Sequence, residues 1–399
     1  MALEKFTISR DDGVYECFPH LCLTRSGRIL LAYRESNGHV ASDFCRLVLR
    51  RSDDAGRTWS ERFVLRDEVY ENGVLTKWNC PKIQQLGDGR VLLLCDRIDF
   101  PPGEWNATAG NARIVLWFSD DDGASWSDGF ATSVNGICPD VVTELADGTW
   151  LLPANTYADG MKRVVQNVSA SADRGRTWGP PLDICPDPDY RLAEASVVAC
   201  PDGELVVYLR EESGRGRPLQ KMISRDRGRS WEGPFDTLNP AAHGMPVSGV
   251  TRDGLVLTLG RFNLRSGWRV DMSPETVRRR LERRSIVVPN VPENADFRSR
   301  LKPGPGTRID EHEIVIVGGG TPPHTFAFLE PLASALEADL DRQEGLLLHL
   351  DHDRNAISCD SGYTGWVEYE RGRFLAANYI NDDAPMAQIR GYRFSVEDF

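Results

Sequence analysis

The chain has 399 residues, and 41% of them are apolar, so it can bury the core of one large domain or of two ordinary ones. Its formal net charge of −12 argues against a nucleic-acid partner, which would require a basic surface. The sequence contains no apolar run of membrane-spanning length, and residues 1–6 lack the basic start and apolar stretch of a secretion signal.

In chain order, the sequence alternates short turns with apolar strands. Six turns of the type Asp-Gly, Ser-Gly or Arg-Gly each lead into such a strand. The apolar runs are Ile29–Tyr33, Val91–Leu94, Trp150–Leu152, Leu205–Tyr208, Leu255–Leu257 and Phe374–Ala377. Turn-bounded strands at this density are typical of all-β structure. Because the runs are almost continuously apolar, we expect them to be inner strands packed between neighbouring sheets.

A second pattern, Ser-x-Asp-x-Gly-x-Thr/Ser-Trp, occurs four times, beginning at Ser52, Ser119, Ser171 and Ser224. The Ser and Asp side chains can hold a turn by accepting backbone N–H groups, and the Gly supplies a backbone angle that other residues avoid. The Trp can pin the turn onto its sheet. Each copy is therefore predicted to be the tip of a β-hairpin, and repetition at this period indicates a repeat architecture.

The four copies resemble the Asp box of the sialidase-like β-propellers. The resemblance implies a ring of β-sheet blades, which has no long open edge. Together with the six turn–strand units, it predicts that residues 1–399 form one six-bladed β-propeller, with seven blades as the alternative.

The regular spacing fails between Asp253-Gly254 and Arg371-Gly372, where no clear turn–strand unit occurs. We expect an insertion around 274–308 in the connection from the fifth to the sixth blade, with a helix-like stretch at 274–284. The alternative is a degenerate extra blade carried by Glu313–Val317. A second short helix is predicted at Leu332–Leu340.

Polar residues follow the apolar strands, where the strands of a propeller converge on one axial face and a pocket can form. They are Arg34, Glu35, Asp96, Arg97, Asn155, Tyr157, Glu194, Arg210, Arg261, Tyr363 and Tyr379. Strand ends rich in Arg, Glu and Tyr indicate a site for a polar, anionic ligand. The alternative is that these residues are ordinary solvated strand ends.

Several segments resemble the sialidase site more specifically. The stretch from Glu194 to Arg210 looks like the one in which a catalytic Glu precedes a substrate-binding Arg, and Gly362–Trp366 looks like the region that holds the nucleophilic Tyr. Pro153–Tyr157 is similar to a segment that places a tyrosine in the pocket. Leu31–Glu35 resembles the first-blade strand that ends in a site Glu.

The resemblance implies that Tyr363 is the nucleophile, since sialidases use a tyrosine where other glycosidases use a carboxylate. A carboxylate would be repelled by the acid group of the substrate. A phenol, with a pKa of about 10, needs a nearby base, and Glu194 would fill this role. We therefore expect Tyr363 and Glu194 to lie within hydrogen-bond reach. The general acid would be Asp43, with His39 in the same loop as its rival.

The sequence also departs from the sialidase pattern. Sialidases clamp the substrate carboxylate with three arginines, and Cys17 stands where the first is expected. Arg210 matches the second, and Arg261 is the candidate for the third.

From the resemblance, the chain is predicted to be a sialidase-like exo-glycoside hydrolase acting on a terminal, acidic or highly hydroxylated sugar of an oligosaccharide. The alternatives are a propeller polysaccharide lyase acting on uronate-containing glycans and a non-catalytic carbohydrate-binding propeller.

The nine cysteines show no C-x-x-C spacing, and their odd number leaves one unpaired. Reduced thiols fit this pattern better than a disulfide framework, so a cytoplasmic location is expected. Cys80, Cys138 and Cys185 recur before or between the strands and are interpreted as buried small apolar residues. The histidines lack metal-ligand spacing, and we predict neither a metal nor a cofactor.

Overall fold

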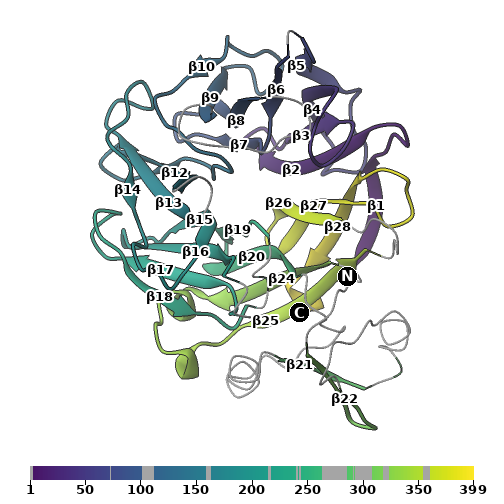
Figure 1. Ribbon diagram of the computed structural model, residues 1–399, viewed down its shortest axis with the longest axis vertical. Coiled ribbons are helices and arrows are strands. Elements are labelled where there is room, and N and C mark those ends of the chain that lie inside the picture. The colour runs from purple at the N-terminus through teal and green to yellow at the C-terminus, as the bar shows by residue number, and fades with distance from the viewer. Residues whose placement is uncertain are drawn as a thin grey trace.

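Six antiparallel sheets surround a central axis in the computed structural model, which describes residues 3–71, 73–100, 112–158, 163–213, 217–239, 241, 244–262, 285–290, 292, 308–317, 323–353 and 360–399 (Figure 1). Each sheet is one blade of a β-propeller. The prediction of an all-β, six-bladed propeller is confirmed.

The first three blades follow one another along the chain. The first contains β2 (Tyr15–Leu23), β3 (Ile29–Ser36), β4 (Phe44–Ser52) and β5 (Phe63–Val69). In the second, β6 (Leu75–Trp78) and β7 (Lys82–Gln85) both pair with β8 (Val91–Phe100), followed by β9 (Ala112–Ser119) and β10 (Phe130–Ala131). The third contains β11 (Thr143–Glu144), β12 (Trp150–Ala158), β13 (Arg163–Ser171) and β14 (Leu182–Asp183).

The last three blades complete the ring. The fourth contains β15 (Leu192–Ala199), β16 (Leu205–Glu211), β17 (Gln220–Ser224) and β18 (Glu232–Asp236). The fifth contains β19 (Val247–Val250), β20 (Leu255–Phe262), β24 (His324–Pro331) and β25 (Leu346–His352). The sixth contains β26 (Ser361–Glu370), β27 (Arg373–Ile380) and β28 (Gln388–Ser395), followed by the N-terminal strand β1 (Glu4–Ser9).

The six apolar runs lie in β3, β8, β12, β16, β20 and β27, the second strand of each blade. They are inner strands packed between neighbouring blades, as expected, and each is the second strand from the axis. The strand before each of them lies nearest the axis. There β15 contacts β19, β19 contacts β26, and β26 contacts β2. The second strands are apolar on both faces because each is covered by the blades on either side. Leu30, for example, shares a buried cluster with Leu93 and Trp117 of the next blade.

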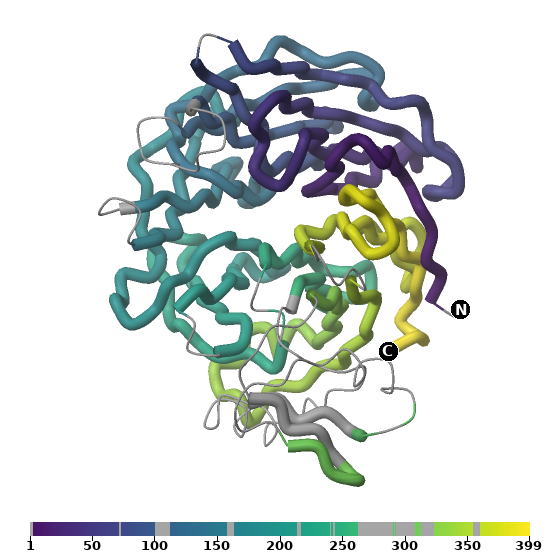
Figure 2. The backbone as a smooth tube through the Cα atoms, turned by 45° about the vertical axis from the view of Figure 1, so that its right-hand side comes forward, coloured from purple at the N-terminus to yellow at the C-terminus, as the bar shows by residue number. Residues whose placement is uncertain are grey.

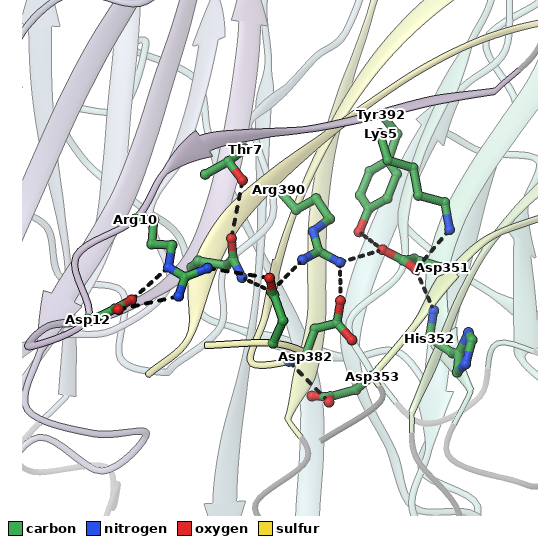
Figure 3. Close-up of polar contacts among 12 residues, drawn as sticks. Lys5, Thr7, Arg10, Asp12, Asp351, His352, Asp353, Asp382, Arg390 and Tyr392 are labelled. Atoms are coloured by element: carbon green, nitrogen blue, oxygen red, sulfur yellow. Dashed lines mark hydrogen bonds and ion pairs between the residues drawn. The ribbon is translucent and has the colours of Figure 1, made fainter. Parts of the chain in front are cut away.

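The ring is closed by both ends of the chain, since β1 pairs with β28 as the outermost strand of the sixth blade. Figure 2 shows the two termini close together at this blade. Figure 3 shows a polar cluster that ties the closure to the fifth blade. The buried carboxylate of Asp351 accepts from Lys5 on β1 at 2.9 Å and from Arg390 and Tyr392 on β28 at 3.1 Å each. A buried acid surrounded by donors from β1 and β28 fixes their position against β25.

The Asp boxes are hairpin tips between the third and fourth strands of four blades, as predicted. In the first box, Ser52 Oγ accepts from the Gly56 amide at 2.8 Å, and Asp54 accepts from the Thr58 amide at 2.8 Å and from its hydroxyl at 2.6 Å. These hydrogen bonds from Thr58 lower the pKa of Asp54 to about 2. The same contacts lower the pKa of the corresponding aspartate to about 2 in the other three boxes.

Each box glycine also sets the distance between two blades. A Cβ added at Gly123 of the second blade would lie 2.8 Å from Leu30 Cδ1 of the first blade. The box glycines of the first and fourth blades meet Leu375 and Leu151 of the preceding blade in the same way. The box glycine therefore supplies both a left-handed backbone, with φ of 80° at Gly123, and the space into which the neighbouring blade packs.

The extra residues before β24 connect two paired strands within the fifth blade. Strands β20 and β24 pair directly from Leu255↔Pro331 to Phe262↔His324. Placement of the insertion in the connection between the fifth and sixth blades is therefore wrong. Between these strands, β21 (Ser285–Pro289), β22 (Arg308–Ile309) and β23 (Glu313–Val317) form a separate three-stranded sheet, and Figure 1 shows β21 and β22 beyond the rim of the ring.

Strand β23 thus belongs to this small sheet and not to a seventh blade. The helix-like stretch predicted at 274–284, like most of the insertion predicted around 274–308, lies outside the described residues. The helix predicted at Leu332–Leu340 is shorter: α3 covers Leu332–Ala335, and a 3-10 turn follows at Leu340–Arg342.

We predict that Gly123→Ala destabilises the protein more than Gly148→Ala does. Both glycines have a similar positive φ, 80° and 85°, so alanine carries similar backbone strain at either position. Only at position 123 does the new methyl group meet a neighbour, whereas Gly148 has nothing within 4 Å. Overpacking of this kind costs about 1–3 kcal/mol. Urea denaturation of both variants checks this, and equal losses would contradict the packing role of the box glycine.

We also predict that Glu16→Gln weakens the loss of stability as the pH rises from about 5 to about 8. Burial raises the pKa of Glu16 from 4.5 to about 7, despite a 2.6 Å hydrogen bond from Ser9 Oγ. The folded state therefore holds this proton more tightly than the unfolded state. The stability it contributes is present below pH 4.5 and is lost as the pH rises through about 7, a change of roughly 3 kcal/mol.

Glutamine is neutral throughout this range, so the thermal midpoint of the variant should fall less than that of the wild type between pH about 5 and about 8. Exposed Glu61→Gln is the matched control and should leave the wild-type pH dependence unchanged. Parallel pH profiles for wild type and Glu16→Gln would show that Glu16 does not carry the proton in question.

Candidate active site

Three innermost strands carry a bulge that turns one side chain toward the axis. The pairing register breaks between Cys17 and His20 on β2, between Ala193 and Ser196 on β15, and between Gly362 and Gly365 on β26. The residues inside these breaks include Phe18, Glu194 and Tyr363, with φ of 57°, 53° and 50°. A left-handed backbone is unfavourable for such residues and marks sites where the fold redirects a side chain.

The bulges on β15 and β26 bring Glu194 and Tyr363 together. The Tyr363 hydroxyl donates a hydrogen bond to Glu194 Oε1, although 169 residues separate the two in sequence. Arg210 Nη1 donates to the same oxygen at 2.7 Å, and Arg210 Nη2 lies 3.1 Å from Glu212 Oε1. The proximity of Tyr363, Glu194 and Arg210 that the sequence suggested is present.

The electrostatics of this group keep the phenol protonated. Burial raises the pKa of Tyr363 well above its ordinary value of 10, and the negative charge of Glu194 raises it further. The Arg210 guanidinium acts in the opposite direction. The resting site is therefore a neutral tyrosine whose proton already points at a carboxylate.

A second acidic residue, Asp360, lies at the start of β26 and was not among the predicted site residues. It accepts hydrogen bonds from Tyr15, from Tyr379 at 3.1 Å and from His39 Nδ1 at 2.7 Å. Burial alone would raise the pKa of Asp360. The hydrogen bond and charge of His39, the charge of Arg261 and the hydrogen bond from Tyr15 together have the larger effect, so the pKa of Asp360 is lowered. The signal that could have revealed Asp360 is its place three residues before Tyr363.

Aromatic contacts join the two acidic groups. The Phe18 ring packs 4.9 Å from the Tyr363 ring, 5.3 Å from Tyr379 and 5.6 Å from His39. Arg261 Nη1 lies 3.5 Å from Asp360 Oδ1, and its Cζ lies 5.9 Å from the Tyr363 ring centre. The Glu194–Arg210 and Asp360–Arg261 pairs therefore flank one aromatic cluster.

Arg34 and Glu35 lie near this cluster but do not face it together. Arg34 is buried, donates to the His39 carbonyl at 2.6 Å and to Asn79 Oδ1 at 3.2 Å, and has Phe18 stacked over it at 4.6 Å. Glu35 points to the other face of β3, where it accepts from Arg62 at 2.9 Å. Successive side chains on a strand point to opposite faces, which separates the two. Arg34 therefore holds the loop of His39, whereas Glu35 forms an ion pair with Arg62 within the first blade.

Asp96 and Arg97 are separated in the same way. Asp96 is fully buried and accepts from the amides of Cys80 at 2.7 Å and Cys138 at 3.1 Å. Arg97 faces outward and pairs with Asp99 at 3.1 Å. Asp96 thus links the second and third blades beneath the site, and with the two cysteine thiols it forms the group of potential metal ligands among the described residues.

The remaining predicted residues divide between the site and its surroundings. Tyr157 is half-buried against the core cluster that contains Tyr363, and burial raises its pKa. Asn155 is buried, and its backbone pairs with that of Ile137. Asp43 is exposed, and its carboxylate accepts from the neighbouring Ser42 hydroxyl at 2.9 Å.

Cys17 occupies the place of the expected first clamp arginine as a fully buried residue paired with Arg34 across β2 and β3. Burial raises the pKa of its thiol to about 12. The neutral thiol leaves this corner of the site without the positive charge of an exposed arginine.

A sequence profile of the BNR repeat-like domain matches residues 13–256, more than half of the chain. The chain belongs to the BNR repeat-like domain family. The match covers the four Asp boxes and the strands that carry Glu194 and Arg210. No curated protein sequence matches the chain.

Several solved structures share the fold of this sialidase-like BNR repeat protein. A protein of unknown function from Dyadobacter fermentans DSM 18053 is similar with a TM-score of 0.68 and 18% identity, covering 99% of each chain. The Hadza microbial sialidase Hz136 has a TM-score of 0.62 and 17% identity over 98% of this chain and 68% of its own. The intramolecular trans-sialidase from Ruminococcus gnavus has a TM-score of 0.61 and 14% identity over 96% of this chain and 95% of its own.

Identities in this range show a common sialidase-like fold, and the chemistry must be argued from the side chains. None of the helices in the described part of the chain is long and apolar enough to cross a membrane.

Proposed function

We propose that the protein is a sialidase-like exo-glycoside hydrolase that uses Tyr363 as its nucleophile. The observation that carries the proposal is the buried hydrogen bond from the Tyr363 hydroxyl to Glu194, with Arg210 on the same carboxylate oxygen. A nucleophile, its base and a cation that stabilises the developing phenolate are thereby already in contact.

In the first step, the Tyr363 oxygen attacks the anomeric carbon while its proton passes to Glu194. The bond from the anomeric carbon to the leaving oxygen breaks, and a general acid protonates that oxygen. In the second step, water attacks the anomeric carbon and the bond from that carbon to the Tyr363 oxygen breaks. The acid residue now removes a proton from the water, and Glu194 returns its proton to the tyrosine. The raised pKa of Tyr363 means that phenolate forms only as the proton is transferred.

For the general acid, the contacts favour His39 over Asp43. The His39 imidazole bonds to Asp360 at 2.7 Å and packs on Phe18, which in turn packs on Tyr363. Its side chain is 52% exposed, as an acid that exchanges protons with solvent and a leaving group should be. Among the residues that the structure describes, the carboxylate of Asp43 accepts a hydrogen bond from Ser42 in the same loop.

As substrate we propose the terminal sugar of an oligosaccharide, acidic or highly hydroxylated. Arg210 and Arg261 can donate to its carboxylate or hydroxyl oxygens, while Asp360 and Glu212 can accept from its hydroxyls. The sialidases among the structural relatives make sialic acid the first candidate. The buried thiol of Cys17 weakens the clamp for a carboxylate and favours testing hydroxylated sugars beside it.

We predict that Tyr363→Phe and Glu194→Gln each lower kcat by at least about 100-fold, because either change removes a partner in nucleophile activation. The double variant should be little slower than either single one, since the pair acts as a unit. Initial rates on a panel of aryl glycosides, including an aryl sialoside, measure this.

Tyr208→Phe is the matched control. Tyr208 is fully buried and donates to Glu330 at 2.6 Å, so the same hydroxyl-to-carboxylate contact is lost away from the axis. This variant should lose stability and keep its turnover. Full activity in Tyr363→Phe would refute the proposal. An unsaturated product with strong ultraviolet absorbance would show a lyase, and glycan binding without turnover would show a binding protein.

We predict that His39→Ala lowers activity on glycosides with a poor alcohol leaving group by at least about 10-fold, and much less on those with an acidic phenol. A phenol leaves without protonation, so loss of the acid matters less there. Asp43→Ala serves as the comparison and should leave both activities nearly unchanged. The reverse result would make Asp43 the acid.

A further inference from the structure

Two cysteines from neighbouring blades meet in the core cluster that also contains Tyr363. Cys80 lies between β6 and β7, and Cys138 lies before β11, so 58 residues separate them in sequence. Their sulfur atoms are 3.6 Å apart. Both residues are almost fully buried, and Cys138 shares its core cluster with Tyr363. A carboxylate oxygen of fully buried Asp96 lies within 4.8 Å of both sulfur atoms.

The surrounding hydrogen bonds hold these three groups in place. The backbone amides of Cys80 and Cys138 donate to Asp96 at 2.7 and 3.1 Å. The Asn79 side chain donates to Asp96 at 3.0 Å and lies 3.8 Å from the Cys138 sulfur. Cys138 also has a positive φ of 49°, a left-handed backbone that is unfavourable for a residue with a side chain. The ligand atoms are thus preorganised by the backbone of two blades.

The spacing suits a tetrahedral thiolate site. Zn²⁺ binds cysteine sulfur at about 2.3 Å in tetrahedral geometry, which separates two sulfur ligands by about 3.8 Å. The observed 3.6 Å needs little adjustment. Asp96 can supply a third ligand, as carboxylate oxygen does in many zinc sites.

The charge balance is also favourable. Two thiols that lose their protons to solvent, together with Asp96, carry a charge of −3, and a divalent cation reduces it to −1. This equals the charge of the site with neutral thiols and an ionised Asp96. Loading the site therefore adds no net charge to the interior, where an uncompensated charge is costly.

We propose that Cys80, Cys138 and Asp96 form a binding site for a thiophilic divalent cation, with Zn²⁺ or Cd²⁺ as the ions that fit. The ion would lie next to the Tyr363–Glu194 pair. Binding itself does not depend on the proposed hydrolase activity. Inhibition by the ion does rest on that function.

The test is titration of the reduced full-length protein with Cd²⁺, followed by the ultraviolet charge-transfer band of cadmium thiolate. We expect one ion per chain, displacement of Cd²⁺ by Zn²⁺, and release of about two protons per ion, as thiolate coordination requires. Cys80→Ser and Cys138→Ser should each reduce the band strongly. Cys200→Ser removes a buried thiol from a different cluster and should retain it.

If a serine variant fails to fold, as judged by circular dichroism, Asp96→Asn keeps both thiols and should weaken the affinity for Cd²⁺ by at least about 10-fold. Absence of a one-to-one band, or a band that survives both serine changes, would overturn the proposal. In parallel rate measurements, Cd²⁺ should inhibit the wild type and spare Cys80→Ser. A band without inhibition would uphold the metal site and count only against its coupling to turnover.

Discussion

The structure depends on closure of the ring through β1 and β28. Only in a closed ring do the innermost strands converge, and only then do residues of the fourth and sixth blades meet at the axis. Closure is reinforced by a buried acid, Asp351, which receives donors from Lys5, Arg390 and Tyr392. The same region reaches the site, because Asp353 accepts the amide of Asp360 at 2.8 Å and that of Asp382 at 3.1 Å. The position of Asp360 is thereby coupled to the joining of the chain ends.

Left-handed backbone at non-glycine residues occurs in the Asp boxes and also where the site is built. Phe18, Cys138, Glu194 and Tyr363 all have left-handed backbone angles, and all lie near the axis. Regular strands would turn such side chains into the space between blades, where the cores are apolar. The bulges redirect them, and the surrounding sheet pairing supplies the free energy that the strain costs. Adjacent residues of one strand therefore have different roles: some stabilise the blades by packing between them, and others point to the axis, where the chemistry would take place.

The charges at the axis are paired within the protein. Cys17 is buried where an arginine is expected, and the neighbouring Arg34 is covered by Phe18 and bonded to loop carbonyls. Arg210 and Arg261 are each paired with a carboxylate. The positive charges at the axis therefore balance acidic residues of the protein. An anionic ligand would compete with these carboxylates for the two arginines.

The sequence alone determined the repeat. The Asp boxes and Gly turns are local patterns, and their recurrence predicted the blades, the hairpin tips and the number six. Resemblance to sialidases also brought Tyr363, Glu194 and Arg210 to attention, because each lies within a short recognisable segment. These features depend on contacts within a few residues, which the order of amino acids records directly.

The tertiary structure decided what depends on register and on distant contacts. It separated Arg34 from Glu35 and Asp96 from Arg97, since neighbouring residues on a strand point to opposite faces and the register decides which face is the axis. It brought Asp360 to His39 across 321 residues and Cys80 to Cys138 across 58. It also placed the insertion inside the fifth blade, because β20 and β24 pair over a gap that no local pattern marks. These contacts join residues that are distant in sequence, and the contact of His39 with Asp360 forms only when the first and last blades meet, so no local spacing encodes them.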